Sequence, residues 1–91
     1  MDLDALPGAD LFEKGVADLG RGIISAEALL ASIAAPRLAR IGVEVPGAIA
    51  EPERKLYDLL AMSDPDSAHS RYNALIRRLV SFERAAECAA R

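Results

Sequence analysis

Several features that define common protein classes are rare or absent in this chain of 91 residues. Its single cysteine, Cys88, cannot form an internal disulfide, which favours a reducing, cytoplasmic location. Asp2 and Asp4 give the N-terminus the wrong charge for a secretory signal or a transit peptide. No apolar run approaches the roughly 20 residues that a membrane span needs, so we expect no membrane association.

Aromatic residues are also scarce, since the chain has no tryptophan, two phenylalanines and two tyrosines. Its apolar fraction of 52% consists mainly of alanine and leucine, which favour helices and are sufficient for a globular core. The abundance of alanine and arginine is typical of bacterial proteins. A chain of this length is expected to form one helical domain over residues 1–91, with residues 1–8 as a flexible N-terminal arm.

Apolar periodicity and the Gly and Pro positions predict an all-α fold, a compact bundle of four to five helices with a long C-terminal helix. Pro36 disfavours helix at the preceding residue, so a break is expected there, and a continuous helix kinked at Pro36 is the alternative. Residues 42–51 are expected to form an apolar loop on the core. The expected helices cover residues 9–19, 25–35, 36–41, 52–62 and 64–91.

The first two expected helices carry specific local signals. Gly15 lies inside the first helix, where a close contact with another helix would explain its presence. Ser25 is suited to cap the second helix, because its hydroxyl can accept from a free backbone amide of the first turn. Ile24 and Leu29 occupy the two positions of a hydrophobic staple around that cap.

The last helix is unusually long for this chain. About 25 residues at 1.5 Å each extend roughly 37 Å, whereas a globule of this length has a radius of gyration of about 12 Å. Either two shorter helices stack along it, or part of it meets another chain through the candidate interface of Tyr72, Leu79, Phe82 and Ala86. The predicted core comprises Phe12, Val16, Leu19, Leu29, Leu30, Ile33, Leu38, Ile41, Leu56, Leu59, Leu60, Tyr72, Leu75, Ile76, Leu79, Val80 and Phe82.

The same helix concentrates positive charge. Residues 68–91 hold five arginines and two glutamates, a net charge of +3. Because the whole chain has a net charge of −3, residues 1–67 carry −6. Arg77, Arg84 and Arg91 repeat every seven residues and form a candidate basic ridge for phosphates or an acidic partner. Pairing of the arginines with Glu83, Glu87 or the acidic first half is the favoured interpretation. An i, i+4 pair of Glu87 with Arg91 is also expected.

Few residues point to chemistry. Asp64, Asp66 and His69 have the residue types of a metal site, but no fourth ligand is evident, and helix capping explains the two aspartates. His69 as a general base has no orienting motif around it. Cys88 is expected to be exposed, and no companion motif supports a reactive role. The sequence therefore predicts no catalytic residue, no cofactor and no metal.

A helix-turn-helix over residues 25–41, with Arg37 and Arg40 reading bases, is poorly supported because its second helix would be very short. We therefore expect a small non-enzymatic interaction protein, either a homodimer or an adaptor or regulatory partner of another bacterial protein. One alternative is a nucleic-acid-associated regulator that uses the basic ridge. The other is a small enzyme built around His69.

Overall fold

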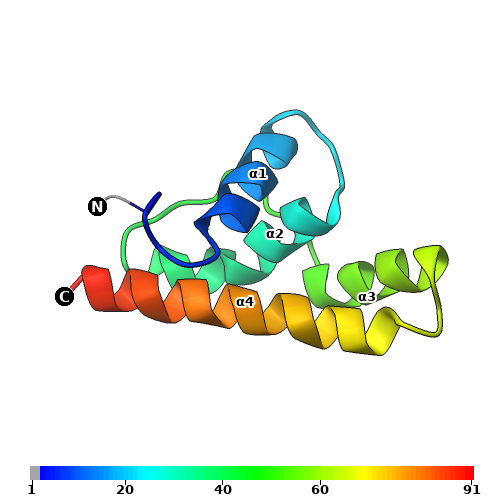
Figure 1. Cartoon of the computed structure of the whole chain (residues 1–91). Helices are drawn as coiled ribbons and strands as arrows, with labels where there is room; N and C mark the ends of the chain where they lie inside the picture. The colour runs from blue at the N-terminus through cyan, green and yellow to red at the C-terminus, as the bar shows by residue number, and fades with distance from the viewer. Residues whose placement is uncertain (1–2) are drawn as a thin grey trace.

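The computed structural model describes residues 3–91 and contains four α-helices and no strand in that range. Figure 1 shows α4 along one side of the molecule and the other three helices on the opposite side. The molecule measures 40 × 25 × 19 Å along its principal axes. The all-α prediction is confirmed, with helices α1 (Ala9–Gly20), α2 (Ala26–Ala39), α3 (Pro52–Ser63) and α4 (Ala68–Ala89).

The crossing of α1 and α2 is tight at Gly15. A Cβ atom on this residue would lie 2.1 Å from the carbonyl oxygen of Glu27 and 2.9 Å from the Cβ of Ala31. These separations are far shorter than van der Waals contact, so only glycine allows the two backbones to approach this closely. The predicted helix–helix contact at Gly15 is confirmed.

The start of α2 follows the expected capping signal, but its end differs from the prediction. The Ser25 hydroxyl accepts from the Ala28 amide at 3.1 Å, as expected of an N-cap. The hydrophobic staple is wrong, because Ile24 is 63% exposed. The break at Pro36 is also wrong: α2 continues through it to Ala39, so the continuous alternative holds.

The long helix α4 is covered by two shorter helices. The ring of Tyr57 on α3 lies edge-on to that of Tyr72 in the first half of α4, with centroids 5.7 Å apart. Arg37 on α2 bonds Glu87 in the second half. Of the two arrangements expected for the long helix, the structure has the one in which α2 and α3 both lie along α4 (Figure 1).

The beginning of α4 is later than predicted. Residues 64–67 form a separate turn, in which the Asp64 carboxylate accepts from the Asp66 amide at 3.2 Å and from the Ser67 hydroxyl at 2.9 Å. Regular helix starts at Ala68, and it ends at Ala89. The two aspartates therefore belong to the turn between α3 and α4, and the helix has 22 residues.

The connecting segments also contact the core. Leu3 and Leu6, in the expected arm, are half-buried against it, and residues 1 and 2 lie outside the described part of the chain. Val43 and Val45 pack inward from the loop after α2, and the buried Ser32 hydroxyl accepts from the backbone amide of Ile49 at 3.0 Å. The prediction of an apolar loop on the core is therefore confirmed.

Most of the predicted core is buried or packs against the buried cluster. Val80 is the exception, because it is half-buried and does not pack against that cluster. Within residues 3–91, none of the helices has the length and apolar character to cross a membrane. The fully or nearly fully buried side chains at the centre include Phe12, Leu29, Leu30, Leu38, Leu56, Leu60, Leu79 and Phe82.

Candidate interaction surface

Three of the four residues of the candidate interface lie inside the protein. Leu79 is 2% exposed, and Phe82 and Ala86 are completely buried by the chain's own helices. The Phe82 ring stacks on that of Phe12 in α1, with centroids 4.9 Å apart. Tyr72 is half-buried at the contact with α3. The apolar stripe of α4 thus faces its own bundle, and those three residues do not meet the solvent.

The two carboxylates of α4 are both engaged by α2. Both carboxylate oxygens of Glu87 accept from the Arg37 guanidinium, one at 2.7 Å from Nε and the other at 2.6 Å from Nη2. A third contact of 3.4 Å joins Arg37 to Glu83. This fork geometry is a strong way to pair arginine with a carboxylate. Arg37 therefore holds α2 against α4, and a role for it in reading bases is not compatible with this contact.

Burial and pairing act in opposite directions on these two acids. The hydrogen bond from Arg37 lowers the pKa of Glu87. Glu83 is only 5% exposed, and its desolvation raises its pKa despite the nearby Arg37 guanidinium. The same bonds with Glu87 raise the pKa of Arg37. The expected pairing of Glu87 with Arg91 is replaced by the pair with Arg37.

As a result, the arginines on the exterior of α4 have no acidic partner on their own helix. Arg71, Arg77 and Arg84 of α4, and Arg91 two residues beyond its end, are all exposed, and we call these four residues the α4 basic face. Among residues 3–91, no carboxylate lies within ion-pair distance of any of them. Arg78, at the margin, lies 3.4 Å from Asp10 on α1. The sequence favours ion pairs between these arginines and the two glutamates of α4. The structure has no such pair for Arg77, Arg84 or Arg91 in residues 3–91.

An apolar strip runs beside Arg77 and Arg84 of the α4 basic face. We define it as Tyr72, Ile76 and Val80, three half-buried residues spaced by four along α4. Residues three and four apart are neighbours on a helix surface, so Val80 lies between Arg77 and Arg84. Tyr57 of α3 extends the strip past Tyr72 and is 39% exposed. The sequence predicts Tyr72, Ile76 and Val80 in the core, whereas each of them is partly exposed to solvent in the structure.

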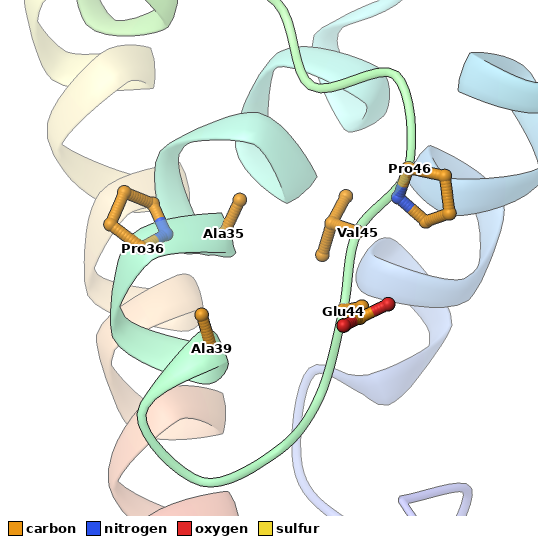
Figure 2. Close-up of a pocket in the computed structure, with 6 residues that line it drawn as sticks. All are labelled: Ala35, Pro36, Ala39, Glu44, Val45 and Pro46. Carbon is orange, nitrogen blue, oxygen red and sulfur yellow. The ribbon is translucent and has the colours of Figure 1, made fainter.

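A shallow hollow of about 440 Å³ opens on another side, between α2 and the extended segment after it. Figure 2 shows Ala35 and Ala39 of α2 on one wall and Val45 on the other, with Glu44 as the only charged residue of the lining. Pro36 and Pro46 complete the lining. A lining with one carboxylate and no second titratable group has no acid–base pair to support catalysis.

The residues singled out for chemistry are dispersed or already bonded. His69 is exposed, and its Nε2 lies 3.2 Å from the Asn73 side-chain amide. Asp64 is bonded within its own turn. In the described range, no group of three or more His, Cys, Asp or Glu side chains is arranged to hold a metal ion. Cys88 is exposed on α4, as predicted.

No protein-family model, no curated protein and no solved structure matches this chain.

Proposed function

We propose that this chain is a small non-enzymatic interaction protein, and that it binds an acidic surface of another protein through the α4 basic face. The observation that carries the proposal is the pairing of Arg37 with Glu83 and Glu87. Because Arg37 of α2 engages both carboxylates of α4, the arginines of the α4 basic face have no acidic partner on that helix. A surface with one sign of charge attracts partners of the opposite sign and steers their approach.

A protein partner is favoured over nucleic acid by the charge of the rest of the molecule. Residues 1–67 carry a net −6, and this charge repels the dense phosphates of a nucleic acid more strongly than a protein surface with a few carboxylates. The nearest aromatic rings, those of Tyr57 and Tyr72, contact each other at one end of the apolar strip, so no row of rings runs between the arginines to stack on successive bases. A nucleic-acid-associated regulator is the second candidate, since arginine side chains also bind phosphates.

A partner of different sequence is favoured over a second copy of this chain. Two copies joined symmetrically through α4 would place the arginines of one basic face opposite those of the other, and like charges repel. Three apolar residues of the candidate interface, Leu79, Phe82 and Ala86, are buried within the monomer. An adaptor that recognises another protein is therefore the form of the proposal that the geometry supports.

The test compares two double variants of equal net charge. Arg77→Glu with Arg84→Glu reverses the centre of the α4 basic face. Arg21→Glu with Arg54→Glu makes the same change in charge at exposed positions outside α4. Each protein is titrated with poly-L-glutamate and, separately, with a 20-base-pair DNA duplex, at low and at high salt. Thermal unfolding shows whether each variant keeps the fold.

We expect the unmodified protein to bind poly-L-glutamate, more weakly at high salt because added ions screen exposed charges. The α4 variant should bind it at least about tenfold more weakly, whereas the control variant should stay within about twofold. If the unmodified protein binds the duplex more tightly than poly-L-glutamate, and the α4 variant does not bind the duplex, nucleic acid replaces the acidic protein as the proposed partner. Binding of neither probe would overturn it.

A further inference from the structure

The apolar strip beside the α4 basic face narrows the class of partner. On the basis of the proposed function, we infer that these two surfaces together receive one acidic amphipathic helix of a partner protein. The apolar side of that helix covers Tyr72, Ile76 and Val80, and its flanking carboxylates reach Arg77 and Arg84.

The spacing on α4 supports a helical partner. The strip from Tyr72 to Val80 extends about 12 Å, at 1.5 Å per residue, and its three members recur at each turn. A partner helix with apolar side chains at i, i+3, i+4 and i+7 presents a stripe with the same period. An extended peptide alternates its side chains between two faces, so it would match the strip less well.

The position of Val80 supports recognition by both kinds of contact at once. This residue is half-buried but does not pack against the core cluster, so its remaining apolar surface is free to be covered. Arg77 lies one turn before it and Arg84 one turn after it along the helix. A helix centred on Val80 therefore meets one guanidinium on either side along the axis of α4.

At the border of the strip, Arg37 compensates the charge of Glu87, and the second carboxylate, Glu83, is only 5% exposed. Glu83 and Glu87 lie on the same side of α4 as the strip, and without Arg37 their carboxylates would repel an acidic helix. Nucleic acid would gain from the arginines and not from the apolar strip. A second copy would gain from the strip and lose from the opposed arginines. Only an acidic amphipathic segment matches both surfaces.

The experiment uses two synthetic peptides of 18 residues with identical composition of Leu, Ala and Glu. In the first, Leu recurs at i, i+3, i+4 and i+7 with Glu on the flanks. In the second, the same residues are permuted so that no apolar face exists. Both are titrated with the full chain, with Val80→Ser, and with Met62→Ser, a control that removes an apolar side chain 84% exposed on α3.

The expected result is binding of the amphipathic peptide at least about tenfold tighter than the permuted one, with a gain of helical circular dichroism in the bound peptide. Val80→Ser should weaken binding of the amphipathic peptide about fivefold to tenfold, the factor expected for uncovering a valine side chain. It should leave binding of poly-L-glutamate unchanged. Met62→Ser should leave both unchanged.

The outcomes separate this inference from the proposed function. Equal binding of the two peptides, with binding of poly-L-glutamate retained, would overturn the inference and leave the proposed function in place. No binding of any acidic probe would overturn both. If the molar mass by light scattering rises with protein concentration and Val80→Ser abolishes the rise, the strip binds a second copy, and the inference is overturned.

Discussion

The hydroxyl of Ser25 joins the carboxylate of Asp18 to the first turn of α2. It donates to Asp18 at 2.5 Å and accepts from the Ala28 amide at 3.1 Å. Asp18 is 5% exposed and also accepts from the ammonium group of Lys14 at 2.7 Å. One serine therefore caps α2 and bonds a buried carboxylate at the end of α1, which fixes the connection between the two helices.

Replacement of Ser25 by alanine should destabilise the protein. The variant loses the N-cap bond, which contributes about 1 kcal/mol in typical helices, and Asp18 loses one of its donors. For a domain of this size, we expect the midpoint of thermal unfolding to fall by about 4–8 °C. Circular dichroism at 222 nm measures the change. Ser81→Ala, on the exposed side of α4, is the control and should leave the midpoint within about 2 °C. An equal effect of both changes would contradict the prediction.

The same carboxylate should make stability depend on pH. The hydrogen bond from Lys14, followed by that from Ser25, lowers the pKa of Asp18 in the folded state. The resulting stabilisation is complete above the unfolded pKa, near 4, and is lost as the pH falls through the lower folded pKa. Asp18→Asn should therefore be less stable than the unmodified protein at pH 7, and the difference should shrink below about pH 4.

Unfolding in urea between pH 7 and pH 2.5 measures this difference. Asp58→Asn, an exposed carboxylate on α3, serves as the control. It should follow the unmodified protein across the whole range. A difference between Asp18→Asn and the unmodified protein that stays constant down to pH 2.5 would show that the carboxylate charge is not the cause.

The contact at Gly15 predicts opposite effects for two glycine substitutions in α1. Alanine is favoured over glycine in helices by about 1 kcal/mol. At Gly15, however, its Cβ would lie 2.1 Å from the Glu27 carbonyl oxygen, so the helices must separate. We expect Gly15→Ala to lose about 1–3 kcal/mol. Gly20→Ala meets no atom within 4 Å and should be neutral or gain up to about 1 kcal/mol. Chemical denaturation measures the free energy of unfolding of both variants. A Gly15→Ala protein as stable as the unmodified one would refute the tight crossing.

The helices could be predicted from the sequence because their signals are local. Ser25 identified the start of α2 through its capping chemistry, and Pro52 identified the start of α3. The break at Pro36 was wrong because a local rule was overridden by packing. Ala34 and Leu38, on either side of the proline, are fully buried, and their contacts with the core hold α2 as one helix.

The surface was harder to predict, because it depends on which side of each helix the bundle covers. The sequence pattern of the apolar stripe of α4 is the same whether the stripe faces its own core or a second chain. In the structure, Phe82 is completely buried in the protein's own core. The bonds of Arg37 with Glu83 and Glu87 join residues 46 and 50 positions apart, so no local pattern reveals them. The spacing of four residues does predict that Glu83 and Glu87 lie on the same side of α4, but it does not predict which helix that side contacts.

The two glutamates that Arg37 contacts should differ in their effect on stability. Burial raises the pKa of Glu83, so its carboxylate is less stable, relative to the protonated form, in the folded state than in the unfolded state. A raised folded pKa contributes stability that is present below the unfolded pKa, near 4.3, and lost as the pH rises through the folded value. The neutral Glu83→Gln should therefore equal or exceed the unmodified protein in stability at pH 7, and the two should converge below about pH 4.

Glu87→Gln should behave in the opposite way. Its carboxylate forms the two short bonds with Arg37, and its pKa is lowered by them, so its stabilisation is present at pH 7 and lost as the pH falls through the lowered pKa. Urea unfolding at pH 7 and pH 3 measures both variants. If Glu83→Gln loses as much stability at pH 7 as Glu87→Gln, Glu83 holds Arg37 as a full partner, and its burial is compensated. If only Glu87→Gln loses stability, one carboxylate holds α2 against α4. Glu83 then carries an uncompensated desolvation cost.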